Sequence, residues 1–155
     1  MVDKLYLKNY LRKQEELQAT RIRYYLLLDK DELSSPAGKT DLPAGNAAFS
    51  AVESIVCKKV AAEEKIKELK EELTKQSKVI NAILERLENP YEKLVMQMRY
   101  EDGLEWDEIR GKIFGSRKDY NGNIEKYNNK VFKIHGAALK HIKELQSEKN
   151  RKLYQ

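Results

Sequence analysis

The amino-acid sequence predicts an all-α protein, in which a long antiparallel helical hairpin or coiled coil precedes a three-helix helix-turn-helix module. Charged residues make up 35% of the 155 positions and aromatic residues 8%, with seven glycines and three prolines. This composition is typical of long helices rather than of a β-sandwich or barrel. Apolar residues also return every three or four positions over most of the chain, which is the spacing of one helix face. We expect two domains, residues 1–88 and 89–155.

The first domain is expected to contain two helices joined by a loop. Apolar residues at helical spacing predict a helix over 3–33, and the only Pro/Gly/Ser-rich cluster predicts a loop at 34–45. From Val52 to Leu87 steps of three and four continue for five heptads, with polar interruptions at Lys59 and Gln76, and this pattern predicts a coiled-coil seam. The seam is longer than the first helix, so we expect a homodimer; an intramolecular hairpin in a monomer is the alternative.

The second domain begins with a clear helix start. Asn89 is a suitable N-cap, Pro90 fits the first helical position, and Glu92 is expected to reach back to the cap. Gly103 permits the positive φ of a sharp turn, after which Trp106 opens a short second helix as an expected core residue. A third helix is expected to bury one face, formed by the following residues: Ile124, Tyr127, Val131, Ile134, Ala138, His141 or Ile142, and Leu145.

Charge is distributed unevenly along the chain. Residues 1–109 hold 18 Lys/Arg and 21 Asp/Glu, whereas residues 110–155 hold 12 and 4, so the net charge of +5 arises at the C-terminal end. Such an excess suggests a polyanionic partner, although an ordinary solvated lysine face is the alternative. The single Cys57 cannot form an intramolecular disulfide, and no apolar run is long enough to span a bilayer. We expect a cytoplasmic protein that does not enter a membrane.

Three stretches of the second half resemble a known family. They are LVMQMRY at 94–100, GLEWDEI at 103–109 and VFKIHGAAL at 131–139. Together they are similar to the region 4 type module of sigma factors and to phage late-transcription regulators of the ArpU and RinA kind, above all a prophage family of Gram-positive hosts. The resemblance covers nearly the whole chain. It implies a transcription regulator whose third helix enters the major groove of double-stranded DNA, with RNA polymerase as a further partner.

The chain departs from this family between the second and third helices. The family has a turn of a few residues, whereas here 115–123 and several more residues precede Val131. Either a longer loop or an extended third helix results, and the periodicity from Ile124 favours the extension. Arg117 and Lys118 in this segment suit phosphate groups.

The third helix carries the remaining candidate DNA contacts. If its apolar residues face inward, Lys126, Asn129, Lys130 and Lys133 point outward and Asn128 lies at the edge. Asparagine can bond bidentately to adenine, and lysine can reach phosphate or guanine.

Other functions are less well supported by the sequence. His135 and His141 are six positions apart, which does not suit a shared metal site, and we find no nucleophile–base pair or phosphate loop. We therefore expect no catalysis and no cofactor. Two alternatives to transcription regulation remain open: a DNA-packaging subunit similar to a terminase small subunit, and a protein-binding antagonist that retains the helix-turn-helix scaffold.

Overall fold

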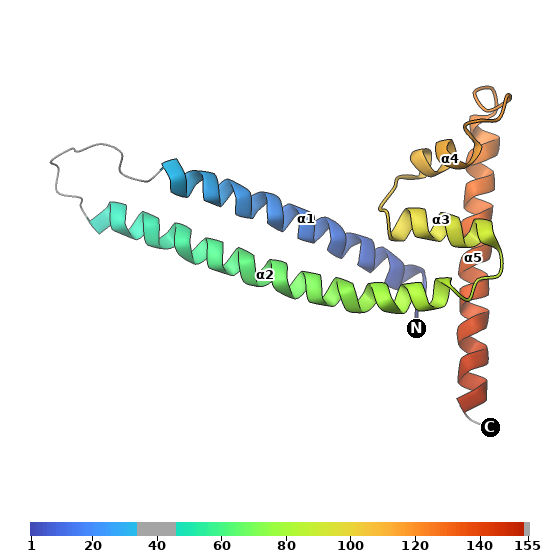
Figure 1. Ribbon diagram of the computed structural model, residues 1–155, viewed down its shortest axis with the longest axis horizontal. Coiled ribbons are helices and arrows are strands. Elements are labelled where there is room, and N and C mark those ends of the chain that lie inside the picture. Colours follow the sequence, from blue (N-terminus) through green and yellow to red (C-terminus); the bar gives the residue numbers. More distant parts are fainter. Residues whose placement is uncertain (34–45, 154–155) are drawn as a thin grey trace. The chain divides into compact units, whose positions relative to one another are not determined.

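A computed structural model describes the backbone of residues 1–33 and 46–153 and the side chains of residues 1–30 and 50–148. Within these ranges the chain is all-α, which confirms the predicted fold class. The described helices, in chain order, are α1 (Lys4–Leu33), α2 (Asn46–Leu84), α3 (Pro90–Tyr100), α4 (Trp106–Phe114) and α5 (Ile124–Leu153) (Figure 1). The loop expected at 34–45 lies outside the described residues.

The internal contacts of the chain divide it into two compact units. Unit 1 combines Met1–Leu11 with Lys75–Gln155, and unit 2 is the intervening segment Arg12–Thr74. This division falls within α1 and α2 rather than at residue 88. The boundary expected at residue 88 stays a prediction that residues 89–155 can fold without residues 1–88.

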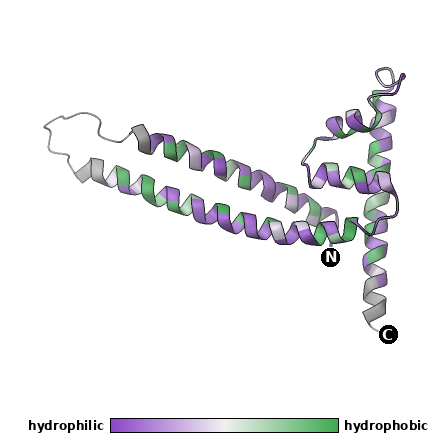
Figure 2. Cartoon of the chain, in the orientation of Figure 1, coloured by the Kyte–Doolittle hydropathy of each residue, from purple (hydrophilic) through white to green (hydrophobic). Residues whose placement is uncertain are grey.

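Unit 2 pairs a segment of α1 with a segment of α2 in antiparallel order. As α1 proceeds, its partners on α2 come from progressively earlier positions in three polar contacts: Lys13 with Glu72, Glu16 with Lys65 at 3.2 Å, and Tyr24 with Glu63 at 2.6 Å. Apolar positions recur along both helices (Figure 2). Ala62, Leu69 and Leu73 of the predicted seam are buried in a single copy of the chain. The centre of the seam is therefore already covered without a second copy.

The core of unit 1 lies where α3, α4 and α5 meet. Its buried cluster consists of Val95 from α3, Ile109 and Phe114 from α4, and Tyr127 and Val131 from α5. Each large apolar side chain removed from water contributes about 1.5–3 kcal/mol. This cluster is thus the main contact that holds the short helices α3 and α4 against α5.

The start of α3 confirms the predicted cap but not the predicted capping box. The side-chain oxygen of Asn89 accepts hydrogen bonds from the backbone N–H groups of Tyr91 at 2.9 Å and Glu92 at 3.4 Å, and Pro90 is the first helical residue. The expected reach of Glu92 back to the cap is wrong. Its carboxylate is only 4% exposed and lies 2.7 Å from Nδ1 of His141 on α5. A buried carboxylate requires a polar or cationic partner, which α5 supplies at this point.

The turn between α3 and α4 follows the sequence prediction. Gly103 has φ of +68°, and the guanidinium of Arg99 donates to the carbonyl of Leu104 at 2.8 Å, which closes the turn. Glu105 caps α4, and its backbone N–H donates to the carboxylate of Glu108 at 2.8 Å in a capping box. These local bonds fix the direction in which α4 leaves the turn.

α5 begins at Ile124, as the periodicity predicts, so residues 115–123 form the connection from α4. Tyr127, Val131, Ala138 and Ile142 are buried on its inner face, and His141 is not. The prediction for Ile124 is wrong, since this side chain is 36% exposed. Its place in the first turn of α5 lies beyond the part of the helix that the buried cluster covers.

Candidate nucleic-acid interface

The connection at 115–123 is a series of tight turns that is bonded to α5 through side chains. Three of its backbone N–H groups each donate to the carbonyl three residues earlier. The hydroxyl of Tyr127 donates to Asp119 at 2.6 Å, and Lys126 forms an ion pair with the same carboxylate at 3.1 Å. The Tyr127 bond, and then the bond from Lys126, hold the pKa of Asp119 below its usual range. The loop therefore has a defined conformation next to the first turn of α5.

Arg110 of α4 forms a second set of hydrogen bonds, which includes one to Tyr120 of this loop. Its Nε donates to the hydroxyl of Tyr120 at 2.9 Å, and its Nη1 donates to Asp107 at 2.6 Å and also to Oδ1 of Asn128. The bond to Tyr120 is the main reason why the pKa of the Arg110 guanidinium is raised. The structure thus places Asn128, a predicted DNA contact, beside α4 with its carbonyl oxygen already bonded.

Sequence reasoning did not single out Arg110. The spacing of three between Asp107 and Arg110 was the one available signal, because residues at i and i+3 are neighbours on a helix. The partners Tyr120 and Asn128 lie 10 and 18 positions away and depend on the path of the loop.

The exposed side of α5 carries the other predicted contacts on this helix, namely Lys126, Asn129, Lys130 and Lys133. Lys130 Nζ lies 5.2 Å from the centre of the Tyr127 ring and 5.9 Å from that of Phe114. Asn129 and Lys133 form no hydrogen bond or ion pair with any side chain that the structure describes. These two side chains are therefore available to an external partner, whereas Lys126 and Lys130 are held by contacts within the unit.

The two predicted contacts in the loop, Arg117 and Lys118, are also exposed. The guanidinium carbon of Arg117 lies 5.7 Å from the centre of the Phe114 ring, the ring that Lys130 also approaches. The structure therefore brings a loop cation and an α5 cation around one aromatic side chain. Cations held in this way lose less side-chain entropy when they bind phosphate than free lysines do.

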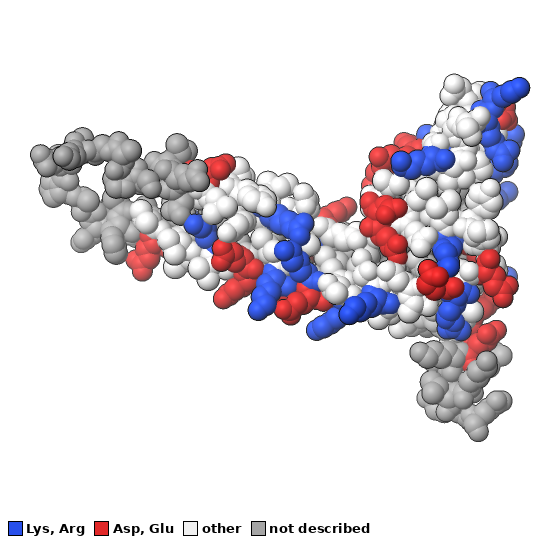
Figure 3. Space-filling model, in the orientation of Figure 1, with Lys and Arg blue, Asp and Glu red and all other residues white. Residues whose placement is uncertain are grey.

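Charges of opposite sign occupy different parts of unit 1. Figure 3 shows Lys and Arg gathered around the loop and the first turns of α5, and Asp and Glu around the α3–α4 turn. Two of the acidic residues near this turn are paired, Glu105 with Arg99 at 3.1 Å and Asp107 with Arg110 at 2.6 Å. Residues 115–133 carry five Lys/Arg and two Asp/Glu, so the loop and the first turns of α5 form a predominantly basic surface.

His135 holds α5 against the first two helices of the module. Its Nε2 lies 2.9 Å from the hydroxyl of Tyr100, and its ring packs edge-on against Trp106 at 4.9 Å. Burial, followed by the nearby charges of Lys4 and Arg99, lowers the pKa of His135 to about 4. The imidazole is therefore neutral at pH 7 and acts as a packing and hydrogen-bonding group.

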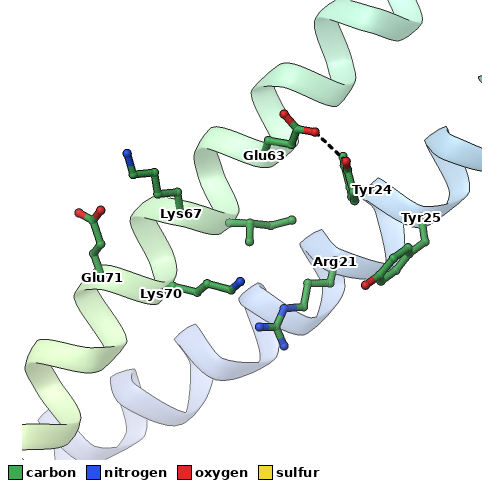
Figure 4. A pocket seen from close by; sticks show the side chains of 8 residues that line it. Arg21, Tyr24, Tyr25, Glu63, Lys67, Lys70 and Glu71 are labelled. Atoms are coloured by element: carbon green, nitrogen blue, oxygen red, sulfur yellow. Dashed lines mark hydrogen bonds between the residues drawn. The ribbon is translucent and has the colours of Figure 1, made fainter.

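Unit 2 has a separate open hollow of about 500 Å³ between its two helical segments. In Figure 4, Lys70 points toward Arg21, whereas Lys67 points away from α1. The hydroxyl of Tyr24 donates to Glu63 across the hollow, and this bond raises the pKa of Tyr24. Apart from Ile66, the lining side chains are charged or aromatic, so the hollow offers mainly polar contacts.

No protein-family model, no curated protein and no solved structure matches this chain. Among the helices that the structure describes, none combines the length and the apolar character needed to cross a bilayer.

Proposed function

We propose that the protein is a DNA-binding regulator, in which α3, α4 and α5 form a helix-turn-helix and the first half of α5 enters the major groove. The observation that supports this best is that α5 exposes Asn129 and Lys133, while Lys130 of the same helix and Arg117 of the loop approach the same Phe114 ring. The major groove admits one α-helix, and cations beside it neutralise phosphates.

The side chains divide into two roles in this proposal. Asn129 points outward without an internal partner, so it reads a base edge, with adenine as the preferred base. The cations of α5 and the loop contact phosphates and set the register of the helix on the duplex. Arg110 and Asn128 act as positioning residues, because their mutual bond ties α4 to α5.

The hydrogen bonds of the 115–123 loop also support the proposed placement of α5 in the major groove. A short turn normally places the third helix of such a module, and here Asp119 and Tyr120 replace that constraint with bonds to Tyr127 and Arg110. The longer connection therefore leaves α5 fixed and adds Arg117 and Lys118 to the surface that faces the DNA backbone. Regulation of phage or prophage transcription, with contact to RNA polymerase, is the cellular role that the sequence resemblance adds to this proposal.

We also propose that the DNA-binding form is a homodimer. Among the side chains that the structure describes, unit 2 exposes six large apolar ones, each at least 43% accessible: Ile22, Tyr25, Leu26, Val52, Val56 and Val60. Exposed apolar groups at this density favour association. Because the centre of the seam is buried within one copy, these exposed side chains, which include the first seam residue Val52, are the ones available to a partner copy. Dimers of helix-turn-helix proteins place two recognition helices on half-sites one DNA turn apart.

Binding-site selection from random duplexes, followed by titration at several salt concentrations, tests the proposal. Lys133→Ala should weaken binding to all sequences alike and reduce the slope of log K against log salt by about 0.9 for each lost contact. Asn129→Ala should cost about 1–3 kcal/mol on the selected site and almost nothing on random duplexes. The matched control is Lys67→Ala, an exposed lysine of unit 2, which should change neither quantity. Failure of the parent protein to bind any duplex at low salt would overturn the proposal.

A further inference from the structure

Phe132 is a large apolar side chain on a polar surface. It is 47% exposed, although it lies three positions after Asn129 and directly before Lys133 on α5. At about 100° per residue, Asn129, Phe132, Lys133 and Gly136 fall within an arc of roughly 100° on the helix. Phe132 therefore belongs to the surface that carries the proposed base-reading residue.

Trp106 orients the ring of Phe132. The ring packs in a T-shaped arrangement against Trp106 of α4, with 5.3 Å between ring centres and 64° between ring planes. Trp106 is itself fixed by the Arg99 guanidinium, 5.1 Å above its ring, and by His135. A ring that is oriented before binding loses little conformational entropy when it meets a ligand.

The position one turn after Phe132 is open. A Cβ atom built on Gly136 would have no neighbouring atom within 4 Å, so nothing in the described structure covers the backbone of α5 at this point. A ligand can therefore approach Phe132 along the helix surface. The acidic side chains at the start of α4 already have partners: Glu105 pairs with Arg99, Asp107 pairs with Arg110, and Glu108 accepts from the backbone N–H of Glu105.

Resting on the proposed function, we propose that Phe132 contacts the C5 methyl group of a thymine in the major groove. Thymine is the only base that presents an apolar group at the major-groove edge, and phenylalanine is one of the side chains suited to it. Asn129 lies one turn before Phe132, so the preferred duplex contains a thymine next to the adenine that Asn129 reads. The exposed cation Lys133, next to Phe132 in the sequence, favours DNA over a protein segment as the occupant.

Replacement of thymine by uracil removes only the methyl group and tests this contact directly. In the selected site, each thymine is replaced by uracil in turn, and the affinity of the full-length protein is measured. One position should lose about fourfold in affinity, which corresponds to about 0.8 kcal/mol for one buried methyl-sized group. Phe132→Ala should bind the thymine site more weakly and should no longer distinguish thymine from uracil there.

Two further variants separate this contact from general effects. Lys133→Ala should lose affinity for both duplexes equally and keep the thymine-to-uracil ratio of the parent. Phe132→Leu, which keeps an apolar side chain, should retain part of the ratio if Phe132→Ala proves to be poorly folded. DNA binding without any uracil-sensitive position, or with the ratio unchanged in Phe132→Ala, would overturn this inference and leave the proposed function standing. Absence of all DNA binding would overturn both.

Discussion

Nδ1 of His141 on α5 lies 2.7 Å from the buried carboxylate of Glu92 on α3. The hydrogen bond that this carboxylate accepts from His141, and then its negative charge, raise the pKa of His141. Six positions earlier on the same helix, burial lowers the pKa of His135 to about 4. As the pH falls, protonation of His141 therefore stabilises unit 1, whereas the cost of protonating the buried His135 destabilises it.

His141→Gln should lower the melting temperature of the protein more at acidic than at alkaline pH. Since the folded state raises the pKa of His141, its contribution is fully present below the unfolded value of about 6.5 and is lost as the pH rises through the folded value. Thermal unfolding of parent and variant between about pH 6 and pH 9 measures the difference. In a Glu92→Gln background, the difference that His141→Gln makes to the melting temperature should no longer depend on pH. A difference that stayed constant over this range with Glu92 in place would contradict the prediction.

His135 should produce the opposite slope. The unfolded chain takes up a proton near pH 6.5 and the folded chain near pH 4, so folding loses up to about 3 kcal/mol of stability as the pH falls through this interval. His135→Leu should flatten the curve of unfolding free energy against pH, even if the variant is less stable at pH 7. Tyr100→Phe keeps the buried imidazole and should keep the slope. An equally steep curve in His135→Leu would show that another group titrates.

Gln76→Leu should stabilise the protein. Oε1 of Gln76 on α2 is buried and has no hydrogen-bond partner among the described residues. Replacing this unsatisfied group by an apolar one should add about 1 kcal/mol to the free energy of unfolding, whereas Gln76→Glu should subtract at least as much. Denaturant unfolding with a two-state fit measures both changes. A lower midpoint for Gln76→Leu would mean that the amide has a role in fixing the helix register.

Val56→Glu and Leu26→Glu should convert the proposed dimer to a monomer without loss of helicity. Both side chains are exposed in a single copy, at 46% and 57%, so the charge harms only an interface between copies. Leu69→Glu is the contrasting variant, because it places the charge in the buried seam and should unfold unit 2. Sedimentation and circular dichroism distinguish these outcomes. A parent chain that sediments as a monomer at high concentration would contradict the dimer.

The helices were predictable because their signals are local. Asn89 and Pro90 define the start of α3 by capping geometry, and Gly103 defines the turn by its backbone freedom. The contacts of Glu92 were not predictable, since the choice between the cap and His141 depends on where α5 crosses α3, 49 positions later in the chain. No local pattern encodes that crossing.

The same distinction applies to the candidate interface. The outward direction of Asn129 and Lys133 follows from the helical period alone. The engagement of Asn128 by Arg110, and the exposure of Phe132 beside Trp106, depend on which flank of α5 is covered by α4. That packing depends on the path of the 115–123 loop. The sequence pattern allowed either a longer loop or an extended third helix there.

The backbone N–H of Val2 donates to Oε1 of Gln146 at 2.6 Å, and Nε2 of Gln146 donates back to the carbonyl of Val2 at 2.8 Å. Unit 1 is therefore closed by a contact that spans 144 positions, and all of unit 2 lies between its two partners in the sequence. On the ribosome, unit 2 can pair its helices from nearby segments, while Val2 has no access to Gln146 until the second half of α5 has emerged. Unit 1 should therefore be the last part of the nascent chain to become resistant to proteases, and chains stalled before Gln146 should remain cleavable near Val2.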